Sequence, residues 1–373
     1  MKRILTVNGG SSSLRYALFE ARAQPLRLFA GKLERLSGDP DRAVDAMLEQ
    51  LQAEAAYAAP DAIGHRIVHG MQHAAPERIT PALLAELRRI VPYDPEHLPR
   101  EIGFIRAMQR RFKKIPQAAC FDTAFHHSMP RVATLLPIPR RYTQRGVRRY
   151  GFHGLSFTFL LRELVRLGDP AASAGRVILA HLGSGASLAA LRDGHCVDTS
   201  MGFTPTAGLV MGTRSGDLDP GLLGYLSVHE HMNARAIQAM VNHESGLLGV
   251  SETSADVRDL LAHEEHDERA REALDLFCYQ AKKWIGSFAA VLGGLDTLVF
   301  AGGVGENSAP VRRRICQGLE FLGLQIDAAA NERSAAAIST QQSRVSVRII
   351  RTDEEFVIAD ETARLLGLNE AGD

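Results

Sequence analysis

The chain has 373 residues, 45% of them hydrophobic, and its 43 lysines and arginines balance its 43 aspartates and glutamates. A chain of this length buries one large core or, more readily, two ordinary ones, which predicts a two-domain enzyme with a cleft. The balanced charge shows no long run of one sign. It therefore excludes the broad basic face of a nucleic-acid-binding protein, and a small-molecule ligand is expected.

The predicted secondary structure alternates between strands and helices along the whole chain. The expected strands are 4–7, 14–19, 27–33, 62–68, 117–121, 176–180, 187–191, 297–301 and 345–350. The expected helices are 41–55, 81–90, 100–112, 156–167, 233–243, 269–292, 310–322 and 354–365. Their starts are marked by Ser156, by Ser308 two residues before Pro310, and by Thr352 with Glu355 as a capping box. This order predicts an α/β fold.

The chain carries no signal for export or for a membrane partner. It begins directly with a strand-like run, and its most apolar region, 285–304, is interrupted by Asp296 and several glycines. Its four cysteines, at 120, 196, 278 and 316, are far apart and include no C-x-x-C pair. This spacing argues against disulfides and structural zinc, and it predicts buried free thiols in a reducing cytoplasm.

Two stretches of the chain, 7–14 and 181–188, read almost as copies of each other. Each lies between two apolar runs, so its glycines and serines are expected in a hairpin turn, where backbone N–H groups can approach an anion. A third turn, 302–308, is expected to lead into a helix whose N-terminus favours a phosphate. No G-x-x-x-x-G-K-[ST] string and no G-x-G-x-x-G string after a strand occurs, which disfavours P-loop and Rossmann folds.

The duplicated turns resemble those of the actin and sugar-kinase superfamily, in which two related domains close over a nucleotide. Seven strings in order then resemble the acetate kinase family along the whole chain. They are 8–14, 65–70, 121–126, 150–154, 211–217, 302–307 and 352–355. The resemblance implies reversible phosphoryl transfer from ATP to acetate or propionate, with ATP or ADP and Mg²⁺ or Mn²⁺ bound, in a homodimer. We expect a first domain of 1–150 with 351–373, and a second of 151–350.

The residue types suit a carboxylate kinase. A carboxylic acid with a pKa of roughly 4 is already ionised at neutral pH, so it needs charge neutralisation rather than a general base. Arg66 and Arg214 are the candidates, and the resemblance places Arg214 nearest the phosphoryl group and Arg66 nearer the acetate. A structural salt bridge is the alternative role for Arg66. The family implies that His153 donates a hydrogen bond to the phosphoryl group, and a phosphohistidine intermediate is the alternative.

Acidic side chains at strand or helix ends fit Mg²⁺. The resemblance ties Glu354 to the metal, gives Asp122 a supporting catalytic role and makes Asn8 a second metal-orienting residue. Asn8 could equally be a turn asparagine. Glu355 is better explained as a member of the helix cap.

The resemblance also implies nucleotide contacts and an acyl pocket. The predicted nucleotide contacts are Ser11, Ser13, Arg15, His181, Gly183, Ser184, Gly185, Asp256, Arg258, Gly303, Gly305, Glu306 and Asn307. For Asp256 and Arg258, a helix-start charge with its counterion is an almost equal alternative. The predicted pocket contains Arg66, Val68, His97, Phe152 and Pro205, of which Val68, Phe152 and Pro205 could instead be ordinary core.

Three departures from the family pattern keep other functions open. Arg15 replaces a lysine, Ser184 replaces an asparagine, and the segment 91–99 places His97 in a histidine position only with a short insertion. A sugar or polyol kinase of the same superfamily would use Asp122 as a base. A non-catalytic actin-like protein would bind ATP and ignore carboxylates.

Overall fold

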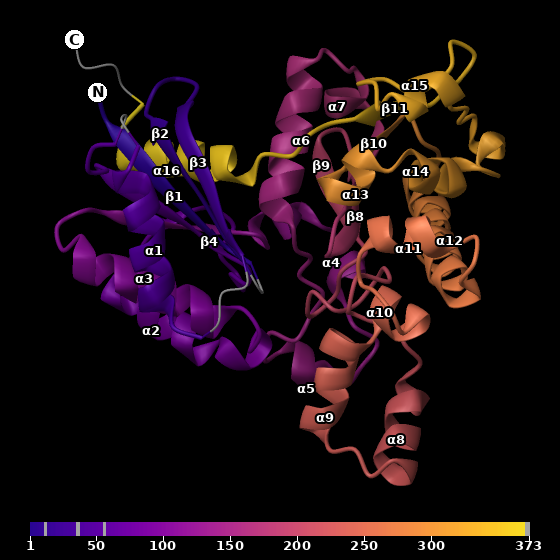
Figure 1. Ribbon diagram of the computed structural model, residues 1–373, viewed down its shortest axis with the longest axis horizontal. Coiled ribbons are helices and arrows are strands. Elements are labelled where there is room, and N and C mark those ends of the chain that lie inside the picture. Colours follow the sequence, from indigo (N-terminus) through magenta and orange to yellow (C-terminus); the bar gives the residue numbers. More distant parts are fainter. Residues whose placement is uncertain (11–12, 35–37, 55–56, 370–373) are drawn as a thin grey trace. The chain divides into compact units, whose positions relative to one another are not determined.

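The computed structural model describes residues 1–10, 13–34, 38–54 and 57–369, and they form two compact units. The first unit contains Met1–His127, Phe152–Phe159 and the C-terminal segment from Asp353. The second contains Ser128–Gly151 and Leu160–Thr352. Each unit is built around its own β-sheet (Figure 1).

The first sheet has the spatial order β3-β2-β1-β4-β6-β5. Its strands are β1 (Arg3–Gly9), β2 (Ser13–Glu20), β3 (Leu26–Glu34), β4 (Ala62–Ile67), β5 (Glu77–Arg78) and β6 (Gln117–Phe121). β1, β2 and β3 form an antiparallel meander, whereas β1, β4 and β6 run parallel. Gly9 of β1 pairs with Leu14 of β2, which confirms the hairpin predicted there.

Helices cover both faces of this sheet. They are α1 (Pro40–Gln52), α2 (Pro81–Arg89), α3 (Leu98–Arg111) and α16 (Glu354–Leu366). Because side chains alternate along a strand, Leu5 of β1 packs with α1 and α3, whereas its neighbour Ile4 packs with Ala359 of α16. Gly64 of β4 allows close approach, since a Cβ there would lie 2.3 Å from Thr362 Oγ1. The C-terminal helix thus packs on strands from the first half of the chain.

The second sheet repeats the pattern of the first. Its strands are β7 (Arg176–Leu182), β8 (Ala186–Arg192), β9 (His195–Thr199), β10 (Thr297–Ala301) and β11 (Ser346–Ile349). The order β9-β8-β7-β10-β11 again places an antiparallel meander beside two strands that run parallel to its first strand. The hairpin β7–β8 corresponds to β1–β2. The duplication predicted from 7–14 and 181–188 is therefore present in the topology.

The helices of the second unit are mostly short. They are α4 (Arg131–Thr134), α5 (Arg140–Thr143), α7 (Ala171–Ala174), α8 (Pro220–His229), α9 (Ala234–Ala239), α10 (Gly246–Ser251), α11 (Val257–His263), α12 (Glu268–Leu292), α13 (Gly302–Asn307), α14 (Ala309–Cys316) and α15 (Ala328–Glu332). α6 (Gly154–Arg166) begins in the first unit and continues in the second.

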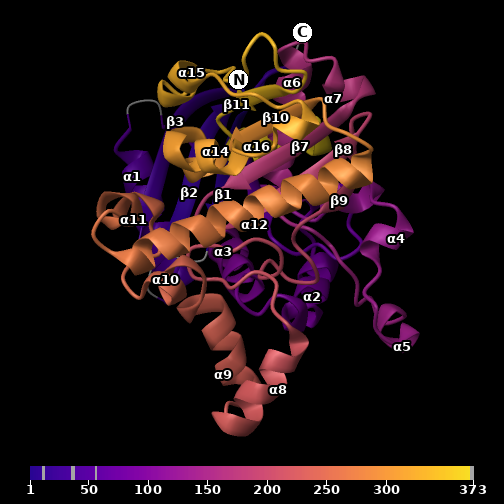
Figure 2. The same cartoon turned by 90° about the vertical axis from the view of Figure 1, so that its right-hand side faces the viewer.

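The long helix α12 supports the second sheet. Asp267 caps its N-terminus, accepting from the backbone N–H groups of Arg269 and Ala270, and Gly293 ends it in a left-handed conformation with φ 72°. Its buried stripe includes Phe277 and Phe288. Figure 2 shows α12 extending across this unit, where it contacts β7 and β8.

Several expected boundaries were wrong. The expected turn 302–308 is the short helix α13 followed by the start of α14. The helix expected to start at Ser156 begins two residues earlier, at Gly154. The expected helix 233–243 consists of α9 and a five-residue π-helical turn, Met240–Glu244. The expected helix 310–322 ends at Cys316, because Gly318 adopts φ 84° and interrupts it.

The predicted capping box at Thr352 was also wrong. Asp353 is the N-cap of α16, and its carboxylate accepts a hydrogen bond from the backbone N–H of Phe356. The Glu355 side chain is consequently available for another partner. Strand β9 and helices α8, α10 and α11 were not predicted, because the segments that form them have weak apolar periodicity.

The predicted state of the cysteines is confirmed, since Cys120, Cys196, Cys278 and Cys316 are all buried and free. Burial raises the pKa of the Cys278 thiol to about 12. Among the described residues, no helix is both long and apolar enough to cross a membrane.

Candidate active site

An arginine and an aspartate meet at the carboxyl ends of two parallel strands in the first unit. Arg66 lies near the end of β4, and Asp122 directly follows β6, where its backbone N–H donates to Ile67 O at 2.9 Å. Arg66 Nε and Nη2 both donate to Asp122 Oδ2, at 2.9 and 2.6 Å. The Asp122 side chain is fully buried and that of Arg66 is 13% exposed. The carboxyl ends of parallel strands are where ligand sites of open α/β sheets form.

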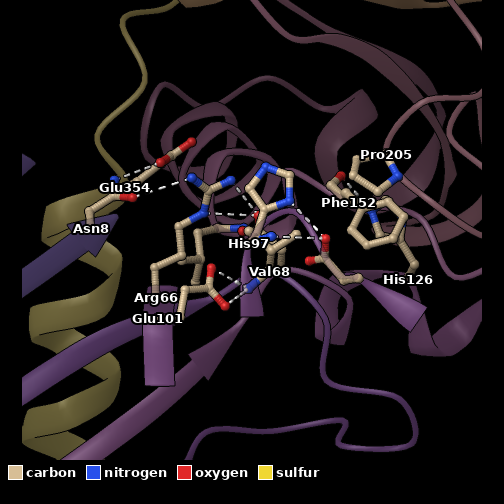
Figure 3. Close-up of polar contacts among 12 residues, drawn as sticks. Asn8, Arg66, Val68, His97, Glu101, His126, Phe152, Pro205 and Glu354 are labelled. Carbon is tan, nitrogen blue, oxygen red and sulfur yellow. Dashed lines mark hydrogen bonds and ion pairs between the residues drawn. The ribbon is translucent and has the colours of Figure 1, made fainter. Parts of the chain in front are cut away.

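Asn8 extends this pair into a chain of polar contacts, shown in Figure 3. Its Oδ1 accepts from Arg66 Nη1 at 3.3 Å. Its Nδ2 donates to Glu354 Oε2 at 2.8 Å and to Glu355 Oε1 at 2.9 Å. Asn8 therefore acts as the link between Arg66 and the first turn of α16, rather than as a turn residue alone. Glu355 was not assigned to this group from the sequence, because the residue was interpreted as part of a helix cap.

The electrostatics of this group are dominated by carboxylates. Burial raises the pKa of Asp122, and the nearby Glu354 raises it further, while Arg66 opposes the shift. Burial and the Glu354 charge likewise raise the pKa of Glu355. Burial alone would lower the pKa of Arg66, but Asp122 and Glu354 raise it. Asp122 and Glu354 thus act on one guanidinium, Glu355 lies beside Glu354, and the site favours a further cation.

The residues present fit a magnesium ion that phosphate oxygens and water help to hold. Within the described residues, no three His, Cys, Asp or Glu side chains are grouped as a metal cage. Mg²⁺ does not require such a cage, because it usually binds one or two carboxylates together with substrate phosphates and water. The Glu354 charge repels both the Asp122 and the Glu355 carboxyl groups, and a divalent cation beside Glu354 would relieve this repulsion.

The segment that carries Phe152 and His153 is held against Asp122. Gly154 is required there, since a Cβ would lie 1.9 Å from Asp122 O. Leu155 N–H approaches Asp122 Oδ1 at 3.5 Å. Phe152 is buried, and its carbonyl is 2.9 Å from His126 Nε2 (Figure 3). His153 adopts φ 58°, an unusual conformation for a non-glycine residue that is often found at functional sites.

The segment 91–99, which differs from the family pattern, packs against β4. Asp94 is buried, and its Oδ1 lies 2.8 Å from His97 Nδ1. The two carboxyl oxygens of Glu101, which is also buried, accept from Val68 N–H at 3.1 and 3.2 Å.

Glu101 was missed by the sequence reasoning. Burial, and then the Asp94 charge, raise its pKa well above the usual carboxyl value. Its position could have indicated this, because Glu101 is an acidic residue on the buried, otherwise apolar face of α3, with Leu98 and Ile102.

Two further predicted residues lie on β2 or near it. Ser13 O accepts from Gly10 N–H at 2.8 Å, which closes the first hairpin. Arg15 is exposed and pairs across the strands with Asn8. Ser11 lies outside the described residues.

The remaining predicted residues belong to the second unit. They are His181, Gly183, Ser184, Gly185, Pro205, Arg214, Asp256, Arg258, Gly303, Gly305, Glu306 and Asn307. The hairpin β7–β8 is closed by Gly183 N–H donating to Gly185 O at 3.0 Å, and Ser184 O accepts from Gly212 N–H at 3.0 Å. Arg214 Nη1 donates to Pro205 O at 2.7 Å.

The Glu306 and Asn307 side chains, which follow β10, form hydrogen bonds with backbone groups. Glu306 Oε1 accepts from the N–H groups of Gly302 and Thr352, at 2.9 and 3.1 Å. Asn307 Nδ2 donates to Gly303 O at 2.9 Å. The Glu306 carboxylate thus joins α13 to the segment that follows β11.

Asp256 and Arg258 form a local pair. Asp256 is the N-cap of α11, accepting from Arg258 N–H at 2.9 Å, and the two side chains form an ion pair at 2.5 Å. The Arg258 side chain is 88% exposed. In this geometry, Asp256 is a charge at the start of a helix and Arg258 is its counterion.

The duplicated sheets and the strand-end site define an α/β protein with two actin- or sugar-kinase-like domains. The acetate kinase of Porphyromonas gingivalis has this fold with a TM-score of 0.88 and 36% identity, over 98% of this chain and 100% of that one. In sequence, the chain is 40% identical to an acetate kinase of Rhodopseudomonas palustris, over 97% of this chain and 98% of the relative. It is 39% identical to a propionate kinase of Citrobacter freundii, over 97% and 96%.

The sequence model of the acetokinase family matches residues 34–360. The chain therefore belongs to the acetokinase family, which confirms the resemblance predicted from its seven strings.

Proposed function

We propose that the chain transfers the γ-phosphoryl group of ATP reversibly to a carboxylate oxygen of acetate or propionate, giving ADP and an acyl phosphate. The observation that carries this proposal is the buried chain Asp122–Arg66–Asn8–Glu354 at the strand ends of an acetokinase-family fold. It combines a cation for the carboxylate with acidic groups for a metal.

Arg66 is suited to hold the acceptor carboxylate. Its contacts with Asp122 and Asn8 use one N–H each of Nε, Nη2 and Nη1. A guanidinium has five N–H groups, so one on each Nη is left for a two-pronged contact with a carboxylate. Asp122 fixes the plane of the guanidinium, and this gives the substrate a defined orientation.

The same geometry disfavours a sugar or polyol kinase. Such an enzyme would need Asp122 as a base for a hydroxyl group. Asp122 is fully buried, and the oxygen Oδ2 already accepts two hydrogen bonds from Arg66. A carboxylate substrate needs no base, so the positioning role suffices.

Mg²⁺, or Mn²⁺ in its place, would be held by Glu354 and oriented by Asn8, with Asp122 in support. When bound, the ion would neutralise phosphate charge and screen the repulsion between the two anionic substrates. Asn8 would keep Glu354 in place through the 2.8 Å hydrogen bond that its Nδ2 donates.

In this proposal Arg214 stabilises the equatorial oxygens of the phosphoryl group, and His153 donates a hydrogen bond to it. Transfer is direct and in-line, without a phosphohistidine. Val68, His97, Phe152 and Pro205 would surround the acyl group. The contact of Arg214 Nη1 with Pro205 O would orient the guanidinium. Nucleotide contacts would come from the hairpin 183–185 and the segment 303–307.

Hydroxylamine trapping tests the proposal. Purified protein is incubated with ATP, Mg²⁺ and, in parallel, acetate, propionate and butyrate, and acyl hydroxamate is measured. We expect hydroxamate with acetate or propionate and less with butyrate, because one methylene in a pocket is worth about 1–3 kcal/mol. ATP binding without hydroxamate from any acid would refute a carboxylate acceptor.

A cytoplasmic homodimer is also proposed, from the family resemblance. The four buried free thiols are consistent with a reducing compartment. In the second unit, α8 buries none of its residues, and Tyr225 and Val228 are 54% and 66% exposed. An apolar helix of this kind is suited to pair with a second copy. Sedimentation of Tyr225→Glu/Val228→Glu should then give a monomer where the wild type gives a dimer, and a monomeric wild type would contradict this.

A further inference from the structure

A second candidate site lies at the edge of the first unit, at the opposite end of β6 from Asp122. A cavity of about 510 Å³ opens there between β5, the start of β6 and the residues that follow α3. Its cationic lining residues are Arg78, Lys113 and Lys114, and no described acidic residue lines it. Gln117 and Phe121 are the two ends of β6, so roughly 13 Å of strand separates this cavity from the Arg66–Asp122 pair.

The three cations have no acidic partner among the described residues. All are exposed, and Glu77, which neighbours Arg78 in the sequence, pairs with His73 instead. Three positive charges around one cavity repel one another, and the repulsion is relieved when an anion binds between them.

One residue that lines the cavity, Gln117, carries a buried amide nitrogen without a hydrogen-bond partner. Gln117 lines the cavity and is 3% exposed. Its Oε1 lies 2.8 Å from Nε2 of the buried His65, whereas its own Nε2 has no hydrogen-bond partner in the described part of the protein. Burial lowers the pKa of His65 to about 4, so its ring is neutral, and Nε2 donates because the amide oxygen can only accept. A buried donor without a partner is costly, and such groups call for a specific explanation.

We propose that this cavity binds a small polyvalent anion of the organic phosphate class. Arg78, Lys113 and Lys114 would neutralise the phosphate oxygens, and Gln117 would supply the amide donor. Ile79 and Ile115, which also line the cavity, would contact the carbon part of the ligand. The site shares no residue with the predicted nucleotide, metal or acyl contacts. It goes beyond the proposed phosphoryl transfer and does not depend on it.

Isothermal titration calorimetry of the full chain, without ATP or metal, tests this site with glycerol 3-phosphate as the probe. The variant Lys113→Gln/Lys114→Gln removes two of the three charges from exposed positions that do not contribute to the core. The matched control is Lys282→Gln/Lys283→Gln, the adjacent lysine pair on α12. We expect at least about tenfold weaker binding in the first variant, no change in the control, and weaker binding for all proteins as salt rises.

A second variant, Gln117→Leu, tests the amide donor. It should also weaken probe binding while its circular dichroism and thermal unfolding remain cooperative. The proposal is overturned if the wild type does not bind the probe, or if Lys113→Gln/Lys114→Gln binds it as tightly as the wild type. It is also overturned if the control pair weakens binding equally, because the effect would then be one of net charge. Hydroxamate formation is measured separately, so failure here leaves the carboxylate kinase proposal intact.

Discussion

The two units use the same arrangement of strands but present different chemistry at the strand ends. In the first unit, Arg66 is the next-to-last residue of β4, Asn8 is the next-to-last residue of β1, and Asp122 directly follows β6. In the second unit, the corresponding strand β10 is followed by Gly302. There the contacts are made by backbone N–H groups and by side chains that hold the backbone.

This difference shows how a duplicated scaffold can divide the work of phosphoryl transfer. Buried side-chain charges, which need partners to be tolerated, are concentrated in the first unit. Glycine-rich backbone, which can approach phosphate closely, is concentrated in the second. Each part can therefore be damaged separately, and the four predictions that follow use this separation.

The largest expected effect is on the guanidinium of the first unit. Arg66→Ala should lower kcat about 10²- to 10³-fold, because it removes the cation that neutralises the substrate carboxylate and leaves Asp122 unpaired. The control is Arg176→Ala in the second unit, which breaks a similar arginine–aspartate pair with Asp296 at the start of β7. Hydroxamate formation in that variant should stay near the wild-type rate. A folded Arg66→Ala protein with normal turnover would contradict the assignment.

The next effect concerns the acidic residues. Glu354→Gln should raise the Mg²⁺ concentration needed for half-maximal activity by about tenfold or more, the scale expected when a metal loses a protein partner. Glu306→Gln is the matched change in the second unit, where the carboxylate contacts backbone N–H groups. It should lower the unfolding temperature without changing the Mg²⁺ requirement. An unchanged requirement in Glu354→Gln would argue against its metal role.

Two adjacent glycines in the second unit, Gly302 and Gly303, differ in how well they would tolerate a side chain. Gly302 has φ 76°, and a Cβ there would lie 2.6 Å from Leu182 O, whereas nothing lies within 4 Å of a Cβ at Gly303. Gly302→Ala should therefore cost about 1–3 kcal/mol of unfolding free energy and raise the KM for ATP. Gly303→Ala should change the unfolding free energy by less than about 1 kcal/mol. Urea unfolding and ATP kinetics measure both, and equal costs would contradict the strain argument.

The smallest effect is a pH dependence in the first unit. Because burial raises the pKa of Glu101, the folded protein favours its protonated form. The stabilising contribution is present below the ordinary carboxyl pKa and is lost as the pH rises through the raised value. Glu101→Gln, which keeps an oxygen acceptor for Val68 N–H, should therefore gain about 1 kcal/mol relative to the wild type at pH 8 and little at pH 4.5.

Urea unfolding at the two pH values checks this difference. Glu49→Gln at an exposed position of α1 is the control and should show no pH-dependent gain. A gain for Glu101→Gln that is the same at both pH values would mean that folding does not raise the pKa of this carboxyl group.

Much of the site was predictable from the sequence because its residues stand in short strings next to strand ends. Asn8 and Asp122 directly follow apolar runs, and Arg66 lies near the end of one, so their meeting at one sheet edge follows from strand order. Glu355 and Glu101 were not predictable in this way. Glu355 had a sufficient local explanation as a capping residue, and Glu101 reaches Val68 N–H only because α3 packs on β4.

The sequence by itself determined the alternation of strands and helices, the duplicated hairpins and the family, because these depend on local periodicity and short motifs. The tertiary structure alone decided which side chains share a hydrogen bond across the chain. Asn8 contacts Glu354 across 346 positions, since α16 packs against β1 where Gly64 leaves room for it. Such contacts depend on packing between distant elements, and no local pattern encodes them.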